Sequence, residues 1–168
     1  MPSRIARPTR RLLLLPAAAL YAACVTVRGA RETAPADYSR DVGVATALDI
    51  AEGAARLLDD GQYEVVRRDG PPEIYFETLW RSRGPFADEV DRGATAAQSR
   101  VLLRGRRRPR IGTARDLFAV RVTVENRVLL AASDGWQRVP ATPMFVEHAA
   151  GIARQLELRL RSGVRRYD

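Results

Sequence analysis

The chain has 168 residues, of which 28 are basic and 20 acidic, giving a net charge of +8. Its single cysteine and single histidine exclude an internal disulfide and any metal site built from several such ligands. Four arginines and no acidic residue occur among the first 23 positions, so the rest of the chain carries a net charge of only +4. This weak basicity gives little support for nucleic-acid binding, and we predict no nucleic-acid partner.

The beginning of the chain has the composition of an export signal. The arginines precede an apolar run from Leu12 to Leu20, within the roughly 7–15 residues of a secretory signal. The longest uncharged window, 12–27, contains Pro16 and is shorter than the about 20 residues of a membrane-spanning helix. We therefore predict that residues 1–23 are a signal peptide that is removed; an uncleaved anchor is the less favoured alternative.

The end of this segment, Leu20-Tyr21-Ala22-Ala23-Cys24, resembles the lipobox of bacterial lipoprotein signal peptides. In that family a leucine and two small residues precede an invariant cysteine, which is lipidated and becomes the first residue. The resemblance implies that Cys24 carries a lipid that anchors the protein to a membrane. It also implies a place in the cell envelope, and Val25 favours the periplasmic face of the outer membrane over the inner membrane. Tyr21 stands where the family prefers leucine, which leaves ordinary signal-peptidase cleavage and a soluble product as the alternative.

The remainder divides into a tether and one domain. Residues 24–40 hold the lipidated cysteine and a flexible tether, because Gly29, Pro35 and mixed charges interrupt any apolar period. Residues 41–168 form a single α+β domain.

The first predicted element of this domain is a helix from Asp41 to Asp60. Its polar stripe consists of Asp49, Glu52, Arg56 and Asp59. The apolar positions that we expect to face the core are Val44, Leu48, Ala51, Ala55 and Leu58, widened by Ala47, Ile50 and Ala54.

Four strands follow, at residues 62–68, 73–81, 99–106 and 117–125, with residues 83–98 as a loop. In the second strand, Ile74, Phe76 and Trp80 share the core face. In the fourth, large apolar residues alternate with polar or small ones, which is typical of a half-buried antiparallel strand. Whether residues 128–131 continue this strand or form a fifth one stays open.

The last element is a helix that Thr142 caps and Pro143 begins. Its apolar face consists of Phe145, Ala149, Ile152, Leu156 and Leu160. The predicted fold is therefore a two-layer α+β domain in the order α-β-β-β-β-α, with an antiparallel sheet of about four strands and both helices on one face. The other face is exposed to water and carries Tyr75, Glu77, Leu79, Leu102, Arg104, Arg121, Thr123 and Glu125.

No group of residues has the pattern of a catalytic or metal site. His148 has no second histidine or cysteine as a partner, and we interpret it as a surface or boundary residue. The acidic groups 59–60 and 88–91 lie at a helix end and in a predicted loop, which favours solvated surface over a carboxylate pair or a hard-metal site. We predict no enzymatic activity, no metal and no cofactor.

Two features are candidate contact sites. One is the arginine run at the end of the third strand, which suits anionic groups: Arg104, Arg106, Arg107, Arg108 and Arg110. The other is Trp136, which follows a predicted turn at 134–135 and is a candidate partner contact. A solvated hairpin and a cap on the edge of the core are the plainer interpretations of these two features.

The sequence thus favours an exported lipoprotein of the cell envelope, a non-enzymatic adaptor or accessory subunit that binds another envelope protein. The alternative is a binder or carrier of an anionic envelope lipid or glycolipid through the arginine-rich hairpin. The oligomeric state and the partner do not follow from the sequence.

Overall fold

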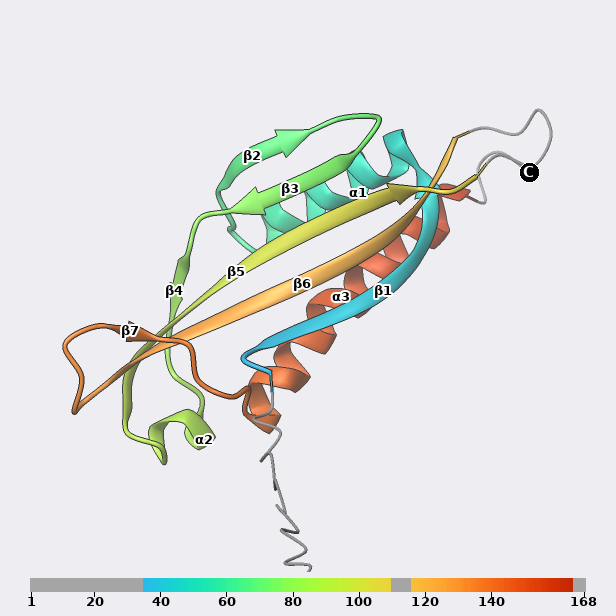
Figure 1. Ribbon diagram of the computed structural model, residues 1–168. Coiled ribbons are helices and arrows are strands. Elements are labelled where there is room, and N and C mark those ends of the chain that lie inside the picture. Colours follow the sequence, from blue (N-terminus) through green and yellow to red (C-terminus); the bar gives the residue numbers. More distant parts are fainter. Residues whose placement is uncertain (1–34, 110–115, 165–168) are drawn as a thin grey trace, which may run out of the picture. The chain divides into compact units, whose positions relative to one another are not determined.

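The computed structural model describes residues 35–109 and 116–164. Within these ranges the chain forms a seven-stranded antiparallel sheet and three helices (Figure 1). The elements are, in chain order, β1 (Asp37–Thr46), α1 (Ala47–Asp60), β2 (Val65–Asp69), β3 (Ile74–Thr78), β4 (Arg81–Arg83), α2 (Ala87–Val90), β5 (Ala94–Arg107), β6 (Leu117–Leu130), β7 (Trp136–Gln137) and α3 (Pro143–Val164).

The sheet is built around one long hairpin, β5 and β6, each 14 residues long. The strand order is β1-β6-β5-β3-β2, with β4 pairing with β5 and β7 pairing with β6. Strand β1, the first in the described part of the chain, lies antiparallel to β6 and forms one edge, and β2 forms the other.

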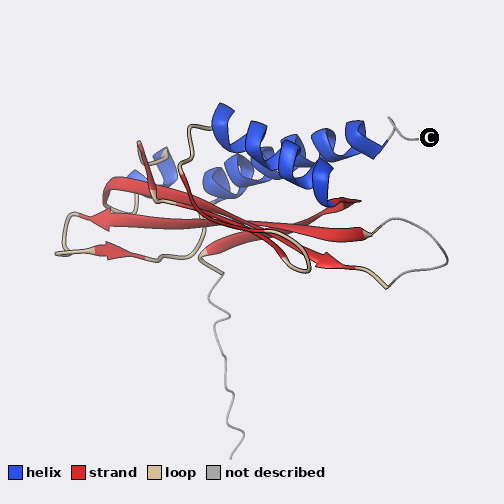
Figure 2. Ribbon diagram, turned by 90° about the horizontal axis from the view of Figure 1, so that it is seen from above, coloured by secondary structure: helices blue, strands red, loops and turns tan. Residues whose placement is uncertain are grey.

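Helices α1 and α3 lie on one face of the sheet, so the domain has two layers (Figure 2). The core lies between them, where alternate residues of β5 and β6 meet the apolar faces of the helices. Its β6 side chains are Phe118, Val120 and Val122, and its α3 side chains include Leu156 and Leu160. The predicted α+β class, antiparallel sheet and C-terminal helix are confirmed.

The predicted apolar face agrees with the buried residues in α3 and only in part in α1. In α3, Phe145, Ala149, Leu156 and Leu160 are buried, as expected. In α1, the predicted positions Ile50, Ala54 and Leu58 are buried. Leu48 is 57% exposed, however, and Leu57, which was not predicted, is buried, so the centre of the predicted apolar face is wrong.

The beginning of the domain also differs from the sequence prediction. Residues 37–46 form strand β1, although residues up to 40 were assigned to the tether and residues from 41 to the first helix. Helix α1 begins only at Ala47, where the Oγ1 atom of Thr46 accepts a hydrogen bond from the backbone N–H of Asp49. The strand carries a bulge between Asp41 and Gly43, and Gly43 has a φ of 121°, a conformation that favours glycine. The order is therefore not α-β-β-β-β-α, because a strand comes first.

The number of strands is larger than the predicted four. The predicted second strand ends at Thr78, and β4 follows as a separate strand at Arg81. The predicted loop 83–98 contains α2 and the first residues of β5. Strand β6 continues unbroken to Leu130, which answers the question left open about residues 128–131.

Candidate functional site: the open face of the sheet

In the described part of the chain, no helix covers the face of the sheet opposite α1 and α3 (Figure 2). Strand alternation shows which side chains belong to this face. Val101, Leu103, Val122 and Val124 are buried on the helix side, so the residues between them, and their cross-strand partners, point to the opposite face. We call it the open face, and its central members are Ser39, Asp41, Tyr75, Glu77, Gln98, Arg100, Leu102, Arg104, Arg121, Thr123, Glu125 and Arg127. The predicted water-exposed positions of β3, β5 and β6 are among them, although Glu125 is buried.

Most charges of the open face are paired across strands. Arg100 of β5 binds Glu77 of β3 through Nη1 at 2.8 Å and Glu125 of β6 through Nε at 2.5 Å. Arg121 of β6 reaches Asp41 of β1 with a 2.7 Å Nη2–Oδ2 contact, and its hydrogen bond lowers the pKa of the Asp41 carboxyl. These pairs tie four neighbouring strands together on the exposed side of the sheet.

A cluster of arginine and tryptophan side chains lies toward the β7 end of this face. The guanidinium of Arg127 lies 4.3 Å from the ring centre of Trp80 and 5.2 Å from that of Trp136. Arg100 lies over the same Trp80 ring at 4.8 Å. We call Gln98, Arg100, Arg127, Trp80 and Trp136 the arginine–tryptophan cluster; cation–π contacts of this kind are worth about 0.5–1 kcal/mol each at exposed sites.

Arg127 differs from Arg100 in having no acidic partner in the described residues. Its Nε donates to Oε1 of Gln98 at 2.7 Å, and Gln98 in turn donates to the Ser82 hydroxyl at 3.2 Å. Burial and the positive charge of Arg100 lower the pKa of Arg127. The side chain is therefore held in one orientation while its charge is not neutralised.

A shallow depression of about 260 Å³ lies in the middle of the open face. It is lined by Tyr75, Leu102, Arg104, Arg121, Thr123 and Glu125. The guanidinium of Arg104 lies 5.7 Å from the ring centre of Tyr75, and no ion pair of Arg104 occurs within residues 35–109 and 116–164.

The arginine run is split by strand alternation. Arg104 and Arg106 lie on the open face, whereas Arg107 lies on the other side of β5 and pairs with Asp116 at 2.5 Å. Arg108 is exposed beyond the end of β5, and Arg110 lies outside the described residues. The run is therefore not one continuous cationic surface over the part that is described.

The two predicted contact features do not come together. Trp136 pairs with Leu129 at one end of β6, and Arg107 pairs with Phe118 near the other. Eleven residues of strand separate Leu129 from Phe118, a distance of about 37 Å at roughly 3.4 Å per residue. Trp136 is 38% exposed and belongs to the arginine–tryptophan cluster instead.

The sequence prediction missed Arg127, Gln98 and Trp80 as members of one site. Trp80 was assigned to the core by its parity with Phe76, but β3 ends at Thr78 and Trp80 lies over open-face arginines. No local pattern singles out this group, because Gln98 and Arg127 stand in the polar stretches 98–100 and 125–127.

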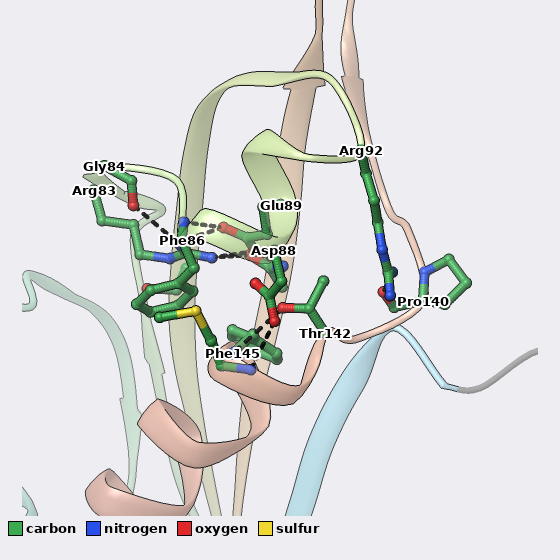
Figure 3. A network of polar contacts seen from close by, with 12 residues as sticks. Arg83, Gly84, Phe86, Asp88, Glu89, Arg92, Pro140, Thr142 and Phe145 are labelled. Carbon is green, nitrogen blue, oxygen red and sulfur yellow. Dashed lines mark hydrogen bonds and ion pairs between the residues drawn. The ribbon is translucent and has the colours of Figure 1, made fainter.

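A second polar network lies on the helix-covered side of the sheet, and its contacts hold parts of the fold together (Figure 3). Arg83 of β4 makes a two-point contact with Glu89 of α2, with Nη–Oε distances of 2.8 and 2.6 Å, and also binds Asn126. Glu89 is 1% exposed and accepts further hydrogen bonds from Asn126 and from the backbone N–H of Phe86. Burial alone would raise the pKa of Glu89, but these hydrogen bonds together outweigh it and lower the pKa.

The same network connects α2 to the beginning of α3. Oδ2 of Asp88 accepts a hydrogen bond from the backbone N–H of Met144 at 2.9 Å, and Arg92 donates to the carbonyl of Pro140 at 3.0 Å (Figure 3). The acidic residues 88–91 thus lie in and beside a short helix rather than in a loop, and Glu89 is buried rather than solvated.

His148 of α3 is a half-buried boundary residue, as predicted. Its ring lies 5.5 Å from that of Phe86, centre to centre. Burial and the positive charges of Arg83 and Arg81 lower its pKa from the ordinary 6.5.

Within residues 35–109 and 116–164, no group of three or more histidine, cysteine or acidic side chains is placed to hold a metal ion. In the same ranges no helix combines the length and apolar character that crossing a membrane requires. A scan against protein-family models finds no match to the chain, and neither does a comparison with curated proteins.

Proposed function

We propose that this protein is an exported, lipid-anchored adaptor of the cell envelope whose open face binds another protein. The observation that carries the proposal is the asymmetry of the sheet. Two helices cover one face, while the other holds tryptophan, tyrosine and arginine side chains, the residue types that dominate binding energy at protein interfaces. Cross-strand ion pairs make this face rigid before it meets a partner.

The experiment is affinity capture from the envelope of the producing cells, with two charge-reversal variants of matched chemistry. Arg104→Glu changes the depression in the open face, and Arg154→Glu changes another exposed arginine, on α3. We expect one envelope protein that wild type and Arg154→Glu retain and Arg104→Glu loses. A partner retained equally by both variants, or no partner at all, would contradict the proposal.

The lipid anchor is tested separately, because Cys24 lies outside the described residues. Cells that produce the full chain are grown with a labelled fatty acid, and the protein is isolated with and without the substitution Cys24→Ala. We expect the label on wild type and none on the variant. An unlabelled wild-type protein would rule out lipidation and leave the adaptor soluble in the periplasm.

The second candidate is binding of an anionic lipid or glycolipid by the arginine-rich hairpin. It is favoured by Arg104, Arg106 and Arg108, which are exposed and form no ion pair in the part of the chain that the structure describes. Vesicles of phosphatidylglycerol distinguish the two candidates. Binding that disappears when these arginines become glutamine supports the lipid candidate, whereas no binding at moderate salt removes it.

A further inference from the structure

The arginine–tryptophan cluster contains an oriented positive charge that the described fold does not use. Four side chains position Arg127: Ser82 of β4 and Gln98 of β5 through a hydrogen-bond chain, and Trp80 and Trp136 through their rings. Only Nε of the guanidinium is used by these contacts. The two Nη atoms have no hydrogen-bond partner in the described ranges, and the residue is only partly buried, so they remain available to a ligand.

We propose that Arg127 is the receptor for a carboxylate of the partner protein, which binds to the open face as an extended acidic segment. This inference rests on the proposed adaptor function and names the chemistry of its partner. A guanidinium whose rotation is already fixed loses little entropy when its two free Nη groups bind an anion.

The surroundings of Arg127 favour an isolated carboxylate over a membrane surface. Its neighbour Arg100 is neutralised by Glu77 and Glu125, and the exposed Arg138 pairs with Asp37 and Glu125. A layer of lipid phosphates would meet these carboxylates as well, at a cost in repulsion. A single carboxylate at Arg127 would meet one unpaired positive charge, which both tryptophan rings contact.

A second unpaired arginine on the same face indicates how long the acidic segment is. Arg104 lies on β5 six residues beyond Gln98, the residue that faces Arg127. Six residues of strand correspond to about 20 Å, too far for one small anion and within reach of an extended peptide. A segment with two carboxylates about six residues apart therefore complements the two arginines.

The experiment uses the only two tryptophans of the protein as the reporter, because both belong to the cluster. The probe is a decapeptide of serine and threonine in which two glutamates, six residues apart, are the only charged side chains, and the matched probe has glutamine in their place. We expect a saturable change in tryptophan fluorescence with the acidic peptide and none with the glutamine peptide.

The matched variants are Arg127→Gln and Arg154→Gln. Both remove one positive charge, but Arg154 is an exposed residue of α3 and does not belong to the open face. We expect Arg127→Gln to weaken peptide binding about tenfold and Arg154→Gln to leave it within about twofold, since solvent and salt screen a charge on the other side of the sheet. If Arg127→Gln does not fold, as judged by circular dichroism, Arg127→Lys serves instead, because it keeps the charge and loses the planar pair of donors.

Three results would overturn the inference: equal losses in the two variants, a response to phosphatidylglycerol vesicles without a response to the acidic peptide, and no response at millimolar peptide. Failure here is distinguishable from failure of the adaptor proposal. An envelope partner lost only by Arg104→Glu, together with an inert acidic peptide, leaves the adaptor standing and removes the acidic segment.

Discussion

Glu89 is the most deeply buried charged side chain among the described residues, and Arg83 is its counter-charge. Removing one member of such a pair leaves the other charge buried without compensation. This costs more stability than replacing both members by apolar residues. We expect Glu89→Gln to lower the free energy of unfolding by about 3 kcal/mol at neutral pH, measured by chemical denaturation. Arg67→Gln, whose partner Asp69 is exposed, is the control and should change it by less than about 1 kcal/mol.

The Arg83–Glu89 pair also predicts a loss of folding stability in acid. The folded-state pKa of Glu89 is lowered relative to its ordinary value of 4.5, so the unfolded chain takes up the proton first as the pH falls. Stability from this group is therefore complete above about pH 4.5 and is lost as the pH falls toward the lowered value. The difference between wild type and Glu89→Gln should shrink over that interval. A difference that stays constant down to pH 3 would contradict this assignment.

His148 produces a second, separate pH dependence. Because its pKa is lowered in the folded state, the unfolded chain is protonated first below about 6.5, and stability falls as the pH drops from there. The chain has no other histidine, so His148→Gln should flatten the unfolding free energy between pH 7 and 5. An unchanged slope in this variant would show that another group titrates there.

At the scale of elements, the junction of β1 and α1 is the place where the sequence prediction and the structure differ most. Thr46 ends the strand and caps the helix, with Oγ1 3.2 Å from the backbone nitrogen of Asp49 and 2.6 Å from its Oδ2. We expect Thr46→Ala to lower the free energy of unfolding by about 1 kcal/mol and Thr46→Ser to recover most of it. Equal stabilities of the two variants would mean that this cap does not stabilise α1.

The reason for the misprediction of this junction is physical. Residues 47–55 include four alanines, whose small side chains give a weak periodicity that fits more than one helix rotation. The apolar positions Val42, Val44 and Ala45 were assigned to the helix by the same pattern, although the bulge at Gly43 places Val42 and Ala45 in the core from a strand. Cross-strand pairing with β6, more than 70 residues away in sequence, decides the structure here, and no local pattern contains it.

Where the side chains are large, the local sequence pattern was sufficient to predict the element and its buried face. The alternation in β6 and the spacing of Phe145, Ala149, Leu156 and Leu160 in α3 predicted both elements and their buried faces. The open face followed from the same alternation. The arginine–tryptophan cluster did not, because it depends on a one-residue shift in the pairing with β5 between Glu77 and Arg81, which inverts the parity of Trp80, and on the pairing of β7, both of which are tertiary features.

At the scale of the whole domain, the two faces of the sheet have different roles in our account. The helix-covered face holds the core and the Arg83–Glu89 network and stabilises the fold. The open face carries the paired charges, the depression and Arg127, and is the proposed surface for a partner. Substitutions on the first should alter stability, and substitutions of exposed residues on the second should alter binding with little change in stability.

The most direct test of this division is site-specific photo-crosslinking in the producing cells. A photoreactive residue replaces Leu102, which lines the depression in the open face, or Leu158, which is 66% exposed on the outer side of α3. We expect position 102 to form a covalent adduct of one defined mass with an envelope protein and position 158 to form none. An adduct from position 158 alone, or none from either position, would contradict the assignment of the open face as the binding surface.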